Sequence, residues 1–289
     1  MSEAWLAIGG LPLHLAGGAS VAQAMALPGM EVFAVPHGDD RSLEMTLDAT
    51  LPQPPMRELH RFSIMEGTGV CRFGVDAEGV YHYRFAEGEE VAFDPRRPDA
   101  AAITAMDSPA KLRFALWLAY CMTGVAHGRM PVHASVVVCD GSAVLCLGES
   151  GTGKSTHTRL WLENIAGTHL LNDDSPIVAA RRDAPAVVYG SPWSGKAPCF
   201  RQERHPVAAL LRLEQRPANS IRRLPTIEAF TALQPSCPPS MAHDERCLDM
   251  VSHFVSGVIS HTPVYRLGCL PDADAARLSH DTIYHPATQ

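Results

Sequence analysis

Short apolar and aromatic runs, separated by turn-forming glycines, characterise the first hundred positions of the chain. These runs occupy residues 61–65, 70–75, 80–85 and 91–93, and pairs such as Glu66-Gly67 lie between them. Strand-length runs between glycine turns are typical of β-hairpins. The pattern therefore predicts a meander of antiparallel strands in a β-rich N-terminal domain, residues 1–100, with linker composition at 94–98.

The first 29 residues are largely apolar and contain a cleavage-like triplet at 22–24. Glu3 is the only charged residue before Glu31, and glycines and a proline interrupt the apolar stretch. A secretory signal needs positive charges ahead of a continuous apolar core. We therefore expect folded structure in this segment.

Helical periodicity begins beyond residue 105. Ser108 is a predicted N-cap with Pro109 at the first helical position, and apolar residues follow at helical spacing until Gly128. The apolar runs 133–139 and 143–147 come next, and the turn residues between them predict a hairpin. A second helix is predicted from Lys154 to about Ile165.

Alternating strands and helices are predicted in the rest of the chain. The strands are expected at 176–180, 186–189, 207–213 and 264–267, and the helices at 226–233 and about 243–259. This mixture predicts an α/β domain over residues 105–289.

Charge and hydropathy narrow the classes of protein to which the chain can belong. The 24 Lys and Arg residues are outnumbered by 31 Asp and Glu, so the formal net charge is −7. A general nucleic-acid binder carries basic clusters, and a membrane span needs roughly 18 consecutive apolar residues. The sequence has neither feature, and we expect partners other than nucleic acid or membrane.

Cysteines and histidines show no spacing typical of a metal site. The eight cysteines include no C-x-x-C pair, and several lie in apolar runs, as free thiols do. His157, His169 and His253 have no metal-ligand partners at usable spacing. This usage favours a reducing, cytoplasmic location.

One motif carries the strongest chemical signal. Residues Gly148–Ser155 match G-x-x-x-x-G-K-[ST] at every fixed position, between a strand-like run and a helix start. Backbone amides of such a loop surround a phosphate, and the following helix directs its positive end toward the same anion. The predicted phosphate-binding residues are Gly148, Glu149, Ser150, Gly151, Thr152, Gly153, Lys154, Ser155 and Thr156. Lys154 would neutralise the β and γ oxygens, and Ser155 would join the Mg²⁺ shell.

Two adjacent carboxylates, Asp173 and Asp174, follow at the end of a short apolar run. One of them can hold Mg²⁺ and the other can accept the proton of an attacking hydroxyl. Adjacent residues of a strand point to opposite faces, so both can serve one site only if the strand ends there. A solvated turn is the competing interpretation of this segment.

These motifs together resemble the catalytic core of HPr kinase/phosphorylase. Val132-His133-Ala134, the short hairpin, the phosphate loop and Asn172-Asp173-Asp174 carry the resemblance, which extends over about residues 110–270. The chain also resembles the related ATP-dependent phosphoenolpyruvate carboxykinases and smaller kinases of lasso-peptide gene clusters. The fold implied is an α/β P-loop core with a mixed sheet, preceded here by the β-rich domain. The hairpin before the loop fits that fold, because a short turn cannot make a parallel crossover.

The resemblance also implies residue roles and cofactors. His133 stands where the family has an active-site histidine, and Asp173 and Asp174 match its acidic pair, one for metal and one for base. ATP and Mg²⁺ are the implied cofactors. The Glu-x-Arg-Gly signature of HPr kinases is absent, which favours an acceptor other than HPr.

Further cations are candidates for stabilising the transferred phosphoryl group. Lys196 lies in a glycine-flanked segment and could reach the γ-phosphate, with Arg201, Arg204 and Arg212 as alternatives. Each could equally be a solvent-exposed side chain. His157 and Trp161 lie four residues apart on the helix after the loop, and packing explains them more simply.

The sequence thus favours an ATP- and Mg²⁺-dependent kinase with Asp174, Asp173, His133 and Lys196 as catalytic residues, and Ser155 and Asp173 as metal ligands. The acceptor would be a serine-type hydroxyl of a peptide, protein or small molecule, and the N-terminal domain is a candidate for binding it. Two alternatives stay open: a nucleotide-gated binding module without transfer activity, and a carboxykinase-like enzyme acting on an oxo-acid. The kinase and both alternatives are compatible with a homo-oligomer.

Overall fold

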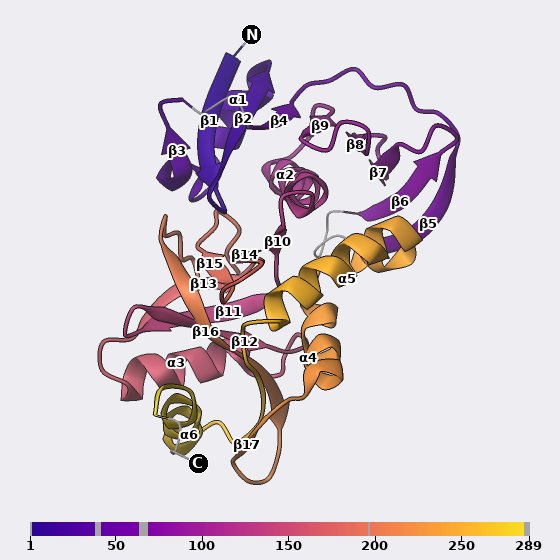
Figure 1. Cartoon of the computed structure of the whole chain (residues 1–289). Helices are drawn as coiled ribbons and strands as arrows, with labels where there is room; N and C mark the ends of the chain where they lie inside the picture. The colour runs from indigo at the N-terminus through magenta and orange to yellow at the C-terminus, as the bar shows by residue number, and fades with distance from the viewer. Residues whose placement is uncertain (1, 38–41, 64–68, 196, 286–289) are drawn as a thin grey trace. The chain divides into compact units, whose positions relative to one another are not determined.

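The computed structural model of the chain describes residues 2–37, 42–63, 69–195 and 197–285 (Figure 1). It divides into two compact units. The first comprises Met1–His127 with Ser240–Leu248, and the second comprises Gly128–Pro239 with Asp249–Gln289. The division falls later than the sequence-based boundary at 100–105, because the helix that follows that boundary packs on strands of the first unit.

The first unit contains a large sheet with two helices. Its elements are β1 (Ser2–Ile8), β2 (Leu11–Gly17), α1 (Ala19–Met25), η1 (Met30–Phe33), β3 (Ala34–Val35), β4 (Leu43–Thr46), β5 (Met56–Ser63), β6 (Val70–Asp76), β7 (Tyr81–Phe85), β8 (Glu90–Phe93), β9 (Ala100–Ile103) and α2 (Pro109–Val125).

The strand order of this sheet is β3-β1-β2-β4-β9-β8-β7-β6-β5. Strands β5 to β8 pair antiparallel in sequence order, so the predicted meander is confirmed for the described residues, while positions 64 and 65 lie outside them. The sheet is nevertheless mixed, because β4 pairs parallel with both β2 and β9. Helix α2 packs on β8 and β9, and Ser108 caps it as predicted, with its hydroxyl accepting from the amide of Lys111.

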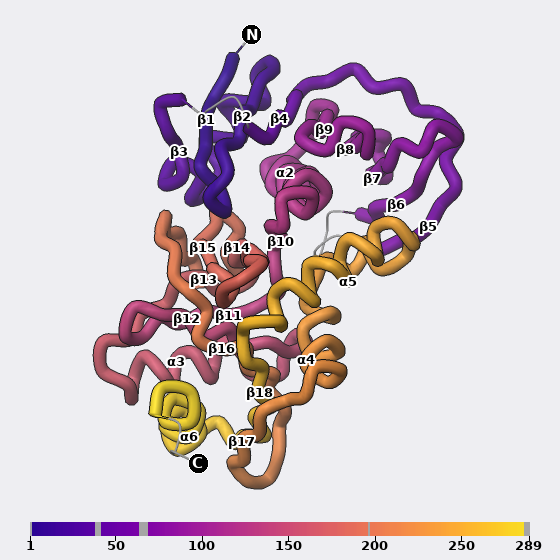
Figure 2. Tube along the Cα trace, viewed as in Figure 1, coloured from indigo at the N-terminus to yellow at the C-terminus, as the bar shows by residue number. Residues whose placement is uncertain are grey.

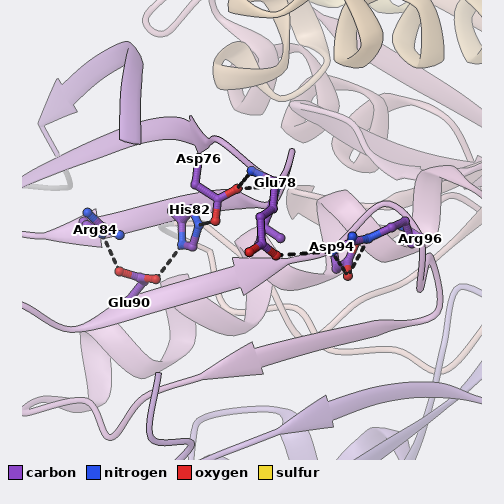
Figure 3. A network of polar contacts seen from close by, with 8 residues as sticks. Asp76, Glu78, His82, Arg84, Glu90, Asp94 and Arg96 are labelled. Atoms are coloured by element: carbon purple, nitrogen blue, oxygen red, sulfur yellow. Dashed lines mark hydrogen bonds and ion pairs between the residues drawn. The ribbon is translucent and has the colours of Figure 1, made fainter. Parts of the chain in front are cut away.

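A charged network is buried within the meander (Figure 3). His82 lies between two carboxylates, with Nδ1 2.6 Å from Oε1 of Glu90 and Nε2 3.1 Å from Oδ2 of Asp76. Arg84 donates to the other oxygen of Glu90. Burial lowers the pKa of His82, but its hydrogen bonds to the two carboxylates outweigh that effect and raise it. Each buried charge is therefore matched by an opposite one.

The segment Ser240–Leu248 returns to the first unit from late in the chain. The hydroxyl of Tyr81 donates to Oδ1 of Asp244 at 2.6 Å, and the hydroxyl of Tyr83 lies 3.0 Å from Oγ of Ser240. These bonds fix the segment on β7. Together with β5 and β6 it lines a cleft of about 930 Å³.

The second unit holds the phosphate-loop motif. Its elements are β10 (Arg129–Pro131), β11 (Ala134–Cys139), β12 (Ser142–Leu147), α3 (Lys154–Asn164), β13 (His169–Asp174), β14 (Ile177–Ala179), β15 (Val187–Tyr189), β16 (Arg204–Gln215), β17 (Ser220–Arg223), α4 (Thr226–Leu233), η2 (Gln234–Ser236), β18 (Val264–Cys269) and α6 (Ala273–Tyr284), while η3 (Pro239–His243) and α5 (Glu245–Ile259) cross the division between the units.

This second sheet has the order β10-β14-β15-β16-β12-β11-β13, with β18 beside β16 and β17 beside β18. Strands β11 and β12 form the predicted antiparallel hairpin, with Asp140 and Gly141 both at positive φ in the turn. Strand β12 pairs parallel with β16, and β16 pairs parallel with β18. The chain is thus a mixed α/β protein with two large mixed sheets.

Helices α3 and α6 lie side by side on one face of this sheet (Figures 1 and 2). Alternate residues of the central strands, such as Val137, Val144 and Leu211, form a buried cluster with Leu160 and Trp161 of α3. This packing holds the first turn of α3, and therefore the loop before it, in a fixed position at the end of β12. Within the described residues, no helix is both long and apolar enough to cross a membrane.

Candidate functional site

The phosphate loop connects β12 to α3, as the motif predicts. Gly151 and Gly153 adopt left-handed backbone conformations, with φ of 83° and 103°, which favour glycine. A Cβ at Gly148 would lie 2.4 Å from Oγ1 of Thr152, so the loop also needs glycine there for space. The sequence therefore dictates a tight turn at the N-terminus of α3, where backbone amides and the helix dipole favour an anion.

Lys154 folds back over its own loop. Its Nζ donates to the carbonyl oxygens of Gly148 at 2.8 Å and Glu149 at 3.1 Å. Burial lowers the pKa of Lys154 despite the nearby carboxylates. These contacts place the ammonium group where it can interact with an anion in the loop.

Ser155 and Asp173 meet at the base of the loop. The Ser155 hydroxyl lies 2.9 Å from Oδ1 and 3.2 Å from Oδ2 of Asp173, which is buried at the end of β13. In an octahedral Mg²⁺ shell with bonds of 2.0–2.1 Å, neighbouring ligand oxygens are about 2.9 Å apart. The hydroxyl and carboxylate oxygens thus fit adjacent positions around such an ion.

His133 connects Lys154 with the second carboxylate. Its Nε2 lies 2.9 Å from Nζ of Lys154, and its Nδ1 lies 3.3 Å from Oδ1 of Asp174. Lysine can only donate, so Nε2 accepts and the ring proton is on Nδ1, directed at Asp174. The structure thereby brings together residues 133, 154, 155, 173 and 174.

Asp174 is in an environment that favours its ionised form. Burial raises its pKa, but the hydrogen bond from His133, the hydroxyl of Ser175 and the charge of Lys154 lower it below the usual value overall. The Asp174 side chain is still 41% exposed. It can therefore contact a solute directly as a carboxylate.

Both aspartates reach the site because β13 ends at Asp174. The glycine-flanked segment after β15 packs against this strand end: Asp174 forms an isolated bridge with Ser194, and the amide of Gly195 donates to the carbonyl of Asp173 at 2.8 Å. A Cβ at Gly195 would lie 2.5 Å from that carbonyl oxygen, so the close approach requires glycine. Lys196, the predicted phosphate cation in this segment, lies outside the described residues.

Asn172 supports this arrangement through its side-chain amide. Its amide group donates to the carbonyl oxygens of Ser191 and Trp193, and its Oδ1 accepts from the amide of Ser175. Asn172 is fully buried. It locks the strand end and the segment after β15 together.

Arg212 is the member of the arginine set that the structure places at the phosphate loop. Its Nη2 donates to Oε1 of Glu149 at 2.9 Å, and its Nη1 is buried with no hydrogen-bond partner among the described residues. Arg201 instead bonds Glu203, and Arg204 is exposed in the pairing with β15. Arg212 can thus supply a second positive charge beside Lys154.

His157 and Trp161 pack as predicted from their spacing. Nε1 of Trp161 lies 3.2 Å from Nε2 of His157 and 3.0 Å from Oγ of Ser279, and all three residues are buried. Burial lowers the pKa of His157 to about 4. This histidine anchors α3 to α6.

No potential metal ligand lies at usable spacing from His169 in the sequence, but the fold brings two of them beside it. Its Nε2 lies 3.0 Å from Oε2 of Glu203, and His205 contacts the same oxygen at 3.2 Å. The partners are more than thirty residues away in the sequence, so no local spacing could reveal them.

Comparison with known proteins gives a distant structural likeness. No family model and no curated protein matches the chain. The structure of the HPr(Ser) kinase/phosphatase from Coxiella burnetii is similar over 52% of this chain and 90% of that chain, with 14% sequence identity and a TM-score of 0.29. A likeness this distant assigns neither an activity nor residue roles, which rest on the geometry of the site.

Proposed function

We propose that the second unit is an ATP- and Mg²⁺-dependent kinase that transfers the γ-phosphoryl group to a serine-type hydroxyl of a peptide, protein or small molecule. The observation that carries this proposal is the contact between the Ser155 hydroxyl and the Asp173 carboxylate beside a phosphate loop. Two oxygens at Mg²⁺-ligand spacing next to an anion site are what a nucleotide kinase requires.

The loop and its cations would bind the nucleotide phosphates. Lys154 already lies over the loop, and its bonds to the Gly148 and Glu149 carbonyls would be exchanged for phosphate oxygens. Bound Mg²⁺ would neutralise the β and γ oxygens, with Ser155 and Asp173 as its protein ligands. Arg212 would add charge on the same side of the loop if nucleotide binding releases it from Glu149.

Asp174 would act as the base toward the acceptor. Its lowered pKa keeps it ionised at neutral pH, and its exposed side leaves room for a hydroxyl. As the acceptor oxygen bonds to the γ-phosphorus and the β–γ bridging oxygen leaves with ADP, the hydroxyl proton passes to the Asp174 carboxylate. His133 would orient that carboxylate through its Nδ1 proton, which makes it a positioning residue.

The first unit would bind the acceptor. Its cleft of about 930 Å³ is lined by charged and aromatic side chains, including Arg57, Tyr81 and Arg246. The arginine side chains of this cleft can hydrogen-bond a peptide acceptor. Arg57→Ala should then weaken use of a peptide acceptor without changing ATP affinity, whereas equal weakening of both would contradict the assignment.

A transfer experiment tests the proposed activity. The purified chain is incubated with γ-labelled ATP, Mg²⁺ and panels of serine-containing peptides, proteins and small alcohols, and labelled products are identified by mass spectrometry. Asp174→Asn should abolish labelling while retaining ATP binding, and the matched exposed variant Asp183→Asn should label at the wild-type rate. Full transfer by Asp174→Asn would refute the base assignment. Tight ATP binding with no transfer by the wild type would favour a nucleotide-gated binding module.

A further inference from the structure

Three potential metal ligands converge in the second unit, at the end of the sheet away from the phosphate loop. They are Nε2 of His169 at the start of β13, Nε2 of His205 at the start of β16, and the carboxylate of Glu203 just before β16. The ligand atoms all lie within 4.8 Å of one another. His169 pairs with Val138 near the hairpin turn, whereas Asp174 at the other end of β13 pairs with Ala134 near the loop. This cluster is therefore separate from the nucleotide site.

The two distances from Glu203 to the histidines are close to those around a tetrahedral ion. Oε2 of Glu203 lies 3.0 Å from Nε2 of His169 and 3.2 Å from Nε2 of His205. Around a tetrahedral Zn²⁺ with bonds of 2.0–2.2 Å, neighbouring ligand atoms are about 3.3 Å apart. A small outward movement of the carboxylate from the two histidines would therefore accommodate the ion.

The contacts of His205 leave room for a metal at Nε2. Its Nδ1 lies 3.3 Å from the carbonyl oxygen of Gly141, and its Nε2 faces Oε2 of Glu203. A neutral imidazole carries one N–H and cannot donate at both nitrogens. A metal at Nε2 resolves this, because Nδ1 then keeps its proton for the carbonyl, as metal-bound histidines usually do.

The ligands are held by the sheet before any ion binds. His169 lies on β13, which pairs with β11, and His205 lies on β16, which pairs with β15. The carbonyl of Glu203 accepts from the amide of Gly190 at 3.1 Å. Arg201 donates to Oε1 of Glu203 at 3.2 Å, which leaves Oε2 directed at the histidines. A site fixed in this way binds metal without ordering a loop.

We propose that His169, Glu203 and His205 form a binding site for a zinc-type divalent ion that joins β13 to the start of β16. Two imidazoles and one carboxylate suit Zn²⁺, with Co²⁺ and Ni²⁺ as further occupants of the same donor set. The side chains are 36%, 36% and 19% exposed, so the fourth position is open to water. The site is independent of the proposed kinase activity.

Calorimetric titration of the untagged, metal-free chain with Zn²⁺ tests the site, with visible absorption of bound Co²⁺ reporting tetrahedral coordination. The wild type should bind one ion at this site and gain thermal stability with Zn²⁺. His169→Gln, Glu203→Gln and His205→Gln should each weaken Zn²⁺ binding at least about 10-fold and remove the Co²⁺ signal. Circular dichroism establishes that each variant is folded, and Glu203→Gln keeps the shape of the side chain.

Two controls separate this site from other ligands. His253→Gln changes an exposed histidine of the same unit, and His280→Gln disrupts the only other group of potential ligands among the described residues, Cys139, Asp140 and His280. Both controls should bind Zn²⁺ as the wild type does. Wild-type affinity in the folded His169→Gln and His205→Gln variants, or loss of binding in His280→Gln alone, would overturn the proposal and leave the cluster as a hydrogen-bonded surface group.

Discussion

The hydroxyl of Ser155 lies 2.9 Å from Oδ1 of Asp173, although the two residues are far apart in the sequence. Ser155 lies in the first turn of α3, and Asp173 lies near the C-terminal end of β13. This contact joins the phosphate loop to the acidic strand end. It distinguishes the two aspartates, because Asp173 contacts the loop hydroxyl while Asp174 contacts His133. Substitutions of the two aspartates should therefore have different effects.

Asp173→Asn should weaken the response to Mg²⁺ more than the binding of nucleotide. The substitution removes a charged oxygen from the predicted metal shell but leaves Lys154 and the loop amides in place. We expect the Mg²⁺ concentration for half-maximal transfer to rise at least about tenfold, and Ser155→Ala to act in the same direction. Transfer rates measured over a Mg²⁺ series check this, with Ser256→Ala as the exposed serine control. An unchanged Mg²⁺ requirement in both variants would mean that the metal binds elsewhere.

His133→Ala should shift the acid limb of the pH profile. His133 lowers the pKa of Asp174, and burial alone would raise it. Without the imidazole the carboxylate becomes protonated at a higher pH, so kcat/KM should begin to fall at a higher pH than in the wild type. The rate at the pH optimum should also fall, because the carboxylate loses an orienting partner. A profile with an unmoved acid limb would show that His133 acts through packing alone.

Arg212→Gln should raise the KM for ATP. The guanidinium contacts Glu149 of the loop, and its buried Nη1 has no partner among the described residues. Charged hydrogen bonds to phosphate contribute about 1.5–3 kcal/mol, so we expect a weakening of roughly tenfold or more. Arg216→Gln, which alters an exposed arginine just after the end of β16, should leave KM unchanged. If the two variants behave alike, Arg212 has only a structural role.

The stability of the second unit should fall in acid because of His157. Its pKa in the folded protein is about 4, below the usual value of 6.5, and it is 2% exposed. As pH falls from 6.5 to 4, the unfolded chain binds a proton at this residue and the folded chain does not. The free energy of unfolding therefore falls by roughly 3 kcal/mol. Denaturant unfolding across this range measures the slope. His157→Gln should have a lower free energy of unfolding at neutral pH, and that free energy should fall less steeply toward acid than in the wild type. His253→Gln should keep the wild-type slope.

Local sequence signals predicted the parts of the site that lie close together in the chain. The phosphate loop, the hairpin before it and the strand end at Asp174 depend on short-range rules of glycine, turn and strand chemistry. Helix α6 was missed because its buried face consists of small residues such as Ala275 and Ala276, which give a weak periodic signal. The caps at Ser108 and Asp272 follow the expected chemistry.

Contacts between distant segments could not be predicted from one sequence. The parallel pairing of β12 with β16 brings Arg212 to Glu149 across 63 positions. The convergence of His169 with Glu203 likewise depends on the path between β15 and β16. Pairing register and crossovers of this kind are set by the whole fold, because many strand orders are compatible with the same local pattern.

The most direct test of the proposed kinase activity follows the γ-phosphoryl group of ATP by phosphorus NMR in the presence of Mg²⁺ and a panel of hydroxyl acceptors. ATP binding is measured by calorimetry on the same samples. We predict a new phosphomonoester signal that requires Mg²⁺, is absent with Lys154→Ala and is lost with Asp174→Asn while ATP binding persists. Equal product formation by the wild type and Asp174→Asn, or tight ATP binding with an unchanged γ-phosphorus signal in every acceptor panel, would contradict it.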